Sequence, residues 1–273
     1  MDDALLVLLL TAAACAPLGV FLILRRLSMM ADAISHTVLL GIVLAFFVTH
    51  DLGSPWLLFG AALMGVVTVS LVELLGKTSL VKYDDAIGVI FPLLFALAVI
   101  LISKYAGNAH LDTDMVLMGE VIYAGLNTVG IGGVEIPAAA LKMGGLALLI
   151  AVFITVFYKE LKVSAFDGEY ARLIGVPTGI LFYAFMSLTS LTTVAAFDAV
   201  GAILVISFFI APGAAALLFT KHLSHTLLLA LLVSMANSAL GYALAVHMNA
   251  SIAGLCAVIN MLVYLLALLM GPK

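Results

Sequence analysis

The sequence predicts an all-α, polytopic membrane protein with about nine membrane-spanning helices, eight being the alternative count. Of its 273 residues, 65% are hydrophobic and only 10% are charged, and the mean hydropathy is +1.31. Water-soluble domains carry a charged share of roughly 25%. About 20 apolar residues cross a bilayer, and the chain holds nine such runs. We therefore expect one membrane domain over residues 1–273 and no separate soluble domain.

The apolar runs are separated by breaks that have recognisable causes. Arg25 and Arg26 end the first run, and residues 50–55 form a polar turn that ends in a proline. Asp198 and Gly201 mark the expected bend between the sixth and seventh runs, which are otherwise nearly continuous. The spans are expected at residues 4–24, 29–49, 56–76, 86–104, 136–158, 178–197, 199–219, 225–246 and 251–270.

Lysine and arginine predict the orientation, because loops on the cytoplasmic side carry an excess of both. With the N-terminus outside, nine of the eleven Lys and Arg residues face the cytoplasm, and only Lys104 and Lys142 lie toward the outer side. We therefore expect an external N-terminus and a cytoplasmic C-terminus. Residues 105–135 are then an outer loop, with an apolar surface helix at 114–125 and a loose glycine-rich segment at 125–133.

Near the start of the second run, Asp32 and His36 lie four residues apart, which places both on one helix face. Ionisable groups inside a membrane are costly and mark ion or proton pathways. The alternative is a neutral pair that only holds helices together. Carboxylate oxygen and imidazole nitrogen suit Mn²⁺, Zn²⁺ or Fe²⁺ better than Na⁺ or K⁺, although the same pair could relay protons.

Three further carboxylates are weaker candidates for metal ligands. In the expected topology, Glu73 and Asp84 fall in the inner half of the membrane with the Asp32–His36 pair, and Asp198 falls at the outer side. An ion path from outside to inside would have that distribution. For the inner carboxylates the alternative is a solvated helix end, where an acid suits a helix N-terminus.

The seventh run contains the small or helix-bending residues Gly201, Pro212 and Gly213, followed by three alanines. Such residues permit close helix approach or a kink. The run is therefore either a tightly packed helix or a pore-lining or dimer-facing helix with a flexible point at Pro212.

The cytoplasmic connection at residues 159–177 predicts an amphipathic helix. Ser164 or Asp167 can cap its start, and Gly175 with Pro177 can end it. Such a helix could lie on the lipid surface, which is the commoner case, or dock on a soluble partner. Its apolar stripe consists of Val163, Phe166, Tyr170 and Leu173.

Several catalytic patterns are missing from the sequence. It has no HExxH metalloprotease motif and no GxSxG nucleophile elbow. Gly76-Lys77-Thr78 looks like the end of a phosphate-binding loop, but Leu71 stands where that motif needs its first glycine. We therefore expect no catalytic residues and no ATPase activity in this chain.

Three stretches taken together resemble the membrane permease subunit of metal-ion (zinc/manganese/iron) ABC importers, the ABC-3 family. They are RRLSMMADAISHTVLLGI at 25–42, VSAFDGEYARLIGVP at 163–177 and FDAVGAILVISFFIAPGAAA at 197–216. Residues 83–91 and 117–125 fit less tightly, and Glu120 stands where the family usually has aspartate.

The resemblance implies that Asp32 and His36 are a metal-handling pair. It recasts 159–177 as a coupling helix that docks on an ATPase, through the motif residues Phe166, Asp167, Glu169 and Ala171. It also implies two cytoplasmic ATPase subunits, a second copy of this permease and an extracellular or periplasmic metal-binding protein. No nucleic acid is expected, and membrane lipid surrounds the chain.

The leading hypothesis is a multi-pass permease in the bacterial plasma (inner) membrane that imports a divalent metal at the expense of ATP hydrolysed by a partner. The cargo is Mn²⁺ or Zn²⁺, with Fe²⁺ as a further candidate, and no cofactor is held permanently. The alternative is a proton-coupled secondary transporter in which Asp32 and His36 relay protons.

Overall fold

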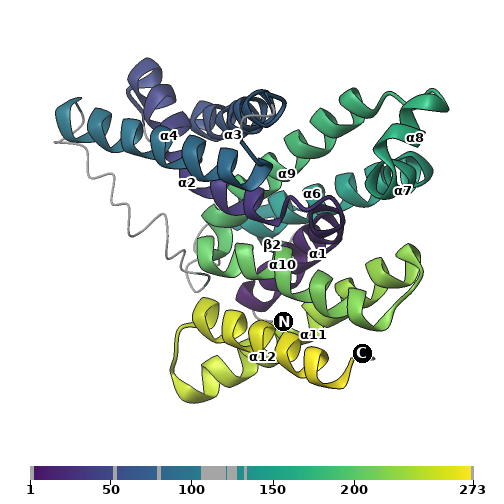
Figure 1. Ribbon diagram of the computed structural model, residues 1–273. Helices are drawn as coiled ribbons and strands as arrows, with labels where there is room; N and C mark the ends of the chain where they lie inside the picture. The colour runs from purple at the N-terminus through teal and green to yellow at the C-terminus, as the bar shows by residue number, and fades with distance from the viewer. Residues whose placement is uncertain are drawn as a thin grey trace. The chain divides into compact units, whose positions relative to one another are not determined.

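The structure is a computed structural model that describes residues 3–51, 54–78, 81–105, 121, 128–131 and 134–271. It is almost wholly α-helical (Figure 1). Within these residues, nine helices are long and apolar enough to cross a membrane. The predicted fold class and all nine predicted spans are therefore confirmed.

The spanning helices match the predicted runs to within a few residues. They are α1 (Asp3–Leu24), α2 (Ser28–Thr49), α3 (Pro55–Gly76), α4 (Tyr83–Tyr105), α6 (Ala138–Val156), α9 (Thr178–Val200), α10 (Ala202–Phe219), α11 (Leu223–Met248) and α12 (Ile252–Met270). The shorter elements are the strands β1 (Thr128–Ile131) and β2 (Val134–Pro137) and the helices α7 (Tyr158–Phe166) and α8 (Gly168–Leu173).

The chain forms two compact units. The first comprises Met1–Ser28, Asp114–Thr178 and Ala195–Lys273, and the second comprises Met29–Thr113 and Gly179–Val194. The long helix α9 contributes most of its length to the second unit and its last residues to the first.

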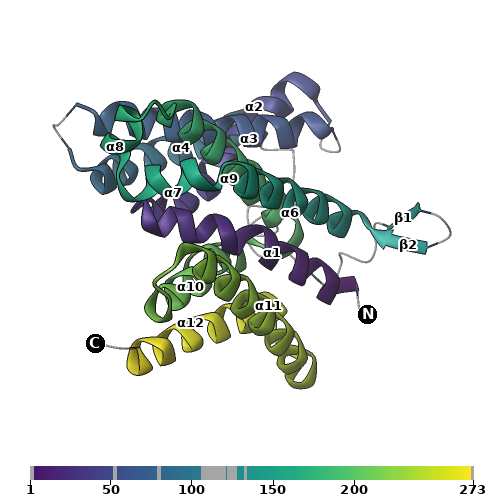
Figure 2. The same ribbon diagram turned by 90° about the vertical axis from the view of Figure 1, so that its right-hand side faces the viewer.

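Helix α1 is the central element of the first unit and packs against α6, α10 and α11 (Figure 2). Its contact with α10 depends on small residues. A Cβ added at Gly19 would stand 1.9 Å from the carbonyl oxygen of Phe209, and one added at Gly213 would stand 3.3 Å from the backbone nitrogen of Val20. Helices in lipid gain little from apolar burial against each other, so close backbone approach and van der Waals packing hold them together.

Helices α11 and α12 of the same unit pack closely and are joined by a buried amide pair. The Asn237 side chain donates a hydrogen bond to Asn260 Oδ1 at 2.8 Å. A Cβ at Gly241 would stand 2.4 Å from the sulfur of Cys256, so these helices also approach closely. Polar pairs of this kind hold membrane helices together at a typical gain of about 0.6 kcal/mol each.

The predicted bend between the sixth and seventh spans is present at Gly201. Helix α9 ends at Val200 and α10 begins at Ala202. Gly201 has φ of 85° and ψ of 159°, a conformation that glycine adopts without the steric penalty of a side chain.

The second unit consists of α2, α3, α4 and residues 179–194 of α9. Helices α2 and α3 touch at Gly41 and Gly60, where an added Cβ on Gly41 would stand 2.3 Å from the Gly60 carbonyl oxygen. A hydrogen bond of 2.8 Å from Thr68 to the Thr37 hydroxyl joins the same helices. Ser190 of α9 donates a hydrogen bond to the Ala62 carbonyl at 2.9 Å, which holds α9 on α3.

The prediction of a loose segment at 125–133 was wrong for residues 128–131, the part of this segment that the structure describes. Residues 128–131 form β1, which pairs with β2 as an antiparallel hairpin. Two runs rich in β-branched residues flank Gly132 and Gly133, a pattern typical of hairpins that a search for helical periods overlooks. The expected helix at 114–125 lies outside the described residues apart from Val121, and Glu120 also lies outside them.

The predicted single amphipathic helix at 159–177 is two short helices, α7 and α8. The chain is extended at Asp167, with φ of −146° and ψ of 94°, and the Asp167 carboxylate accepts a hydrogen bond from the Tyr170 backbone N–H at 2.9 Å. Asp167 therefore caps α8, as predicted, but the cap interrupts a helix that had already begun. An aspartate followed by a glycine favours such a break.

Candidate functional site

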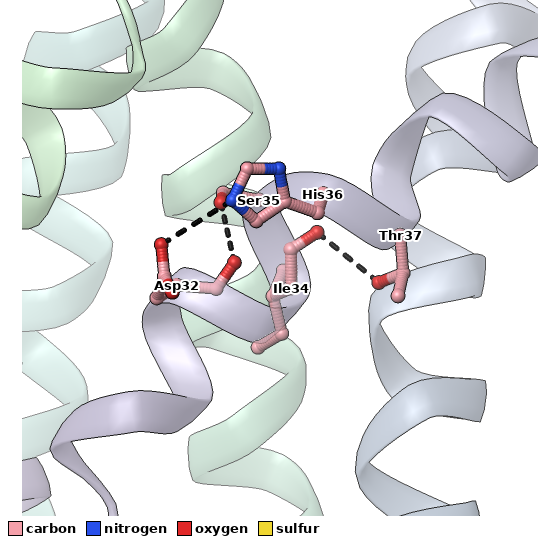
Figure 3. A network of polar contacts seen from close by, with 5 residues as sticks. All are labelled: Asp32, Ile34, Ser35, His36 and Thr37. Atoms are coloured by element: carbon pink, nitrogen blue, oxygen red, sulfur yellow. Dashed lines mark hydrogen bonds and ion pairs between the residues drawn. The ribbon is translucent and has the colours of Figure 1, made fainter. Parts of the chain in front are cut away.

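Asp32 and His36 lie one above the other in the first turns of α2, as the spacing predicted (Figure 3). The distance from His36 Nε2 to Asp32 Oδ1 is 3.5 Å. The His36 side chain is 32% exposed and the Asp32 side chain is 30% exposed, so both remain accessible to a small ion in the single chain.

The hydroxyl groups around this pair bond to the backbone of α2 instead of the carboxylate (Figure 3). Ser35 donates to the Asp32 carbonyl oxygen, and Thr37 donates to the Ile34 carbonyl oxygen at 3.2 Å. These contacts satisfy polar groups that would be costly in an apolar medium. They leave the Asp32 carboxylate oriented toward His36.

Two aromatic rings from α4 lie against the His36 imidazole. The ring centres of Phe91 and Phe95 are 5.4 Å and 5.7 Å from that of His36. Because these residues are four apart, they lie on the same face of α4. Neither phenylalanine was predicted as a site residue, although two aromatic residues at i and i+4 in the sequence are a signal for such a shared face.

The geometry of the pair suits a shared divalent metal ion. Imidazole nitrogen and carboxylate oxygen bind zinc at about 2.0–2.2 Å, so two such ligands on one ion at angles of 90–110° are about 2.9–3.4 Å apart. The observed separation of 3.5 Å differs from that range only slightly. A small side-chain rotation would let both groups contact one ion.

The structure does not gather the weaker carboxylates around this pair. In the described part of the chain, no three His, Cys, Asp or Glu residues come close enough to hold a metal together. Glu73 Oε1 forms an ion pair with Lys77 Nζ, and the two atoms are 2.6 Å apart. Glu73 also interacts with Tyr183. Asp84 is exposed in the first turn of α4, where a negative charge favours a helix N-terminus.

Asp198 has a cationic partner of its own. Lys142 Nζ lies 3.3 Å from Asp198 Oδ2, and both side chains are largely exposed. The pair joins the end of α9 to the first turns of α6 within the first unit. An exposed ion pair contributes little to stability, typically about 0–1 kcal/mol, and here it engages one of the two carboxylate oxygens of Asp198.

The four motif residues of the cytoplasmic segment fall into distinct environments. Phe166 and Glu169 are exposed, Asp167 caps α8, and Ala171 is fully buried. Ala171 is therefore enclosed by other residues of this chain. The exposed apolar side chains of this segment are Phe166, Tyr170, Leu173 and Ile174.

Arg25 connects this segment to the end of α1, a contact that sequence reasoning missed. Its Nη2 atom donates a 2.7 Å hydrogen bond to the Ser164 hydroxyl of α7. Partial burial lowers the pKa of the Arg25 guanidinium from its ordinary value, because desolvation disfavours the charged form. Both residues belong to recognised motif stretches, but nothing in the sequence indicates that they meet.

Of the three residues predicted to gate or to pack, Gly201 forms the bend, while Pro212 and Gly213 are buried in α10. Gly213 lies against Val20 and Ile23 of α1. Within the first unit, these residues therefore have packing contacts.

The described residues form nine helices that are long and apolar enough to cross a membrane, and one of them carries a partly accessible Asp–His pair, as expected of a polytopic membrane transport protein. The sequence matches the family described as the ABC 3 transport family over residues 1–271. The chain belongs to this family, and it is a membrane permease subunit of an ABC transporter. The family match runs across both compact units.

Two curated relatives are each 44% identical to this chain. One is the "Manganese transport system membrane protein MntD" of Bacillus subtilis, aligned over 96% of this chain and 89% of the relative. The other is the "Zinc transport system membrane protein TroD" of Treponema pallidum, aligned over 99% of this chain and 74% of the relative. A solved structure, "PsaBC from Streptococcus pneumoniae in complex with Fab", is 27% identical with a TM-score of 0.81, covering 100% of this chain and 92% of that one.

The Phe95→Ala variant should expose His36. With one ring of its aromatic contact removed, the imidazole should react several-fold faster with diethyl pyrocarbonate, as measured by mass spectrometry of the His36 peptide. Leu93→Ala is the matched control, because Leu93 is a large apolar residue of the same helix turn that is already exposed. Equal rates in the two variants would contradict the role assigned to Phe95.

Proposed function

We propose that this permease imports a divalent transition-metal ion and that Asp32 and His36 bind the ion in transit. The observation that carries this proposal is the 3.5 Å separation of a carboxylate and an imidazole on one face of a membrane-spanning helix. Ionisable groups at such a position are costly and therefore indicate a functional pathway. Binding through two protein ligands is weak, which suits a site that must also release its ion.

The cargo that we propose is Mn²⁺ or Zn²⁺. Relatives named for manganese and for zinc transport are equally similar to this chain, at 44% identity. A relative named as a chelated iron transport protein, YfeD of Yersinia pestis, is 34% identical, which keeps Fe²⁺ as the third candidate. All three ions accept mixed oxygen and nitrogen ligands, so the pair alone does not select among them.

The proposed assembly contains two copies of this permease, two cytoplasmic ATPase subunits and an extracellular or periplasmic metal-binding protein, in the bacterial plasma membrane. ATP binding and hydrolysis by the partners would switch the permease between outward- and inward-facing states. A second copy or water would then supply the remaining metal ligands. The family assignment supports this ATP-driven mechanism over proton-coupled transport.

The segment formed by α7 and α8 is the proposed contact for the ATPase. Its exposed apolar side chains would gain from burial against a protein partner. Leu161 and Ala171 are buried and anchor the segment within the first unit, and Arg25 ties α7 to the end of α1. A force applied at this segment would therefore reach α1 directly.

The variants Asp32→Ala and His36→Ala should each reduce metal accumulation at least tenfold, a loss of about 1.4 kcal/mol or more. The measurement is uptake of Mn²⁺ and Zn²⁺ by cells or vesicles that contain the whole transporter, normalised to assembled complex. Asp85→Asn, which alters an exposed carboxylate at the start of α4, should transport normally. Wild-type uptake by both alanine variants would refute the proposed site.

Phe166→Asp should release the ATPase, because a charged group would replace an apolar contact at the centre of the proposed interface. Co-purification of the tagged permease with its ATPase measures this loss. Phe166→Leu preserves the apolar character and should retain the ATPase. If the aspartate variant binds as well as the leucine variant, the ATPase docks elsewhere.

The proposed orientation has the hairpin outside and the connection between α10 and α11 in the cytoplasm. In intact cells, a membrane-impermeant maleimide should label Glu135→Cys but not Lys221→Cys, which should react only after permeabilisation. The two native cysteines, Cys15 and Cys256, are buried and should give a low background. The reverse labelling pattern would overturn the orientation.

A further inference from the structure

We propose that His222 and His225 form a second metal-binding site, at the start of α11, for a zinc-like divalent ion. Neither residue belongs to the predicted site or to the motifs that identified the family. Both side chains are exposed, and their rings lie 5.6 Å apart, centre to centre. In the proposed orientation the site faces the cytoplasm, where the imported ion is released.

The local backbone explains why the two imidazoles meet. His222 is the N-cap residue of α11, and His225 is the third residue of the helix. Side chains at these two helix positions approach each other, as they do in a capping box. The His222 side chain makes no capping hydrogen bond to the backbone, which leaves its ring available for a ligand.

The turn that carries these residues is held firmly. Leu223 and Thr226, in the same first helical turn, are buried. The Thr226 backbone N–H and its hydroxyl donate to the His222 carbonyl oxygen at 3.0 Å and 3.1 Å. The Thr226 and Thr220 hydroxyls are 2.7 Å apart. The two exposed imidazoles therefore project from a well-anchored backbone.

The ring separation agrees with chelation of one ion. A metal bound about 2.1 Å from an imidazole nitrogen lies about 3.2 Å from the ring centre, so two rings on one ion at 90–110° have centres about 4.6–5.3 Å apart. The observed 5.6 Å needs only a small rotation of exposed side chains.

Binding at this site is expected to be weak and reversible. In the described part of the chain, no third His, Cys, Asp or Glu joins the pair, so water would complete the coordination. The helix N-terminus and the neighbouring Lys221 also disfavour a cation. Neutral imidazole ligands with open coordination positions suit a site that holds an ion briefly after it leaves the membrane path.

The test uses the full-length permease purified with its ATPase, with Zn²⁺ alone as the probe. Diethyl pyrocarbonate modification of each histidine is followed by mass spectrometry with and without zinc. For a dissociation constant of about 10 µM, roughly 100 µM zinc should slow modification of His222 and His225 about tenfold by mass action. His247, at the other end of α11, reports any general effect of zinc on the reagent.

Single variants distinguish chelation from separate binding. In His225→Ala, zinc protection of His222 should fall to less than twofold, and in His222→Asn the same should hold for His225. Asparagine is a favourable N-cap residue, so the second variant keeps the helix start intact. Unchanged protection of the remaining histidine, or no protection in the wild-type protein, would overturn the proposal.

The outcome is independent of the transport site. Asp32→Ala should abolish uptake and leave zinc protection of His222 and His225 unchanged. A failure of protection would remove the second site without affecting the assignment of Asp32 and His36. Conversely, normal uptake by Asp32→Ala together with full protection would refute the transport site alone.

Discussion

An ionisable side chain in an apolar medium needs a partner, and this constraint governs where charge occurs in the chain. Asp32 faces His36, Glu73 is paired with Lys77, and Asp198 with Lys142. Two of these acids have a permanent cation beside them. Among the described residues, the side-chain partner of Asp32 is the His36 imidazole, which can itself bind a metal. That difference supports the proposal that the transported ion passes along α2.

Packing of the helices follows from the same apolar surroundings. Lipid tails solvate leucine as well as a neighbouring helix does, so helix contacts depend on close approach and on hydrogen bonds. Gly19 and Gly213 allow the close approach of α1 and α10. A hydrogen bond between Thr68 and Thr37 joins α2 and α3. The α2–α3 contact therefore positions the helix that carries Asp32 and His36, the proposed ion-binding pair.

The sequence predicted the features that depend on one helix or one turn alone. Spans of about 20 apolar residues, the bend at Gly201 and the shared face of Asp32 and His36 are all local properties. Asp167 caps a helix as expected, but the apolar stripe that was expected on one helix is divided by this cap between α7 and α8. The hairpin of β1 and β2 was not predicted, because its short strands do not show the helical spacing of apolar residues that was used to find the spans.

By itself, then, the sequence determined the fold class, the family and the identity of the Asp–His pair, because hydrophobic length, turn residues and i, i+4 spacing are encoded along the chain. Only the tertiary structure decided which distant groups meet. Phe91 and Phe95 lie against His36, Arg25 bonds to Ser164, and Asp198 is paired with Lys142. Such contacts depend on how helices rotate and slide against one another, and that is set by side-chain packing across the whole interface.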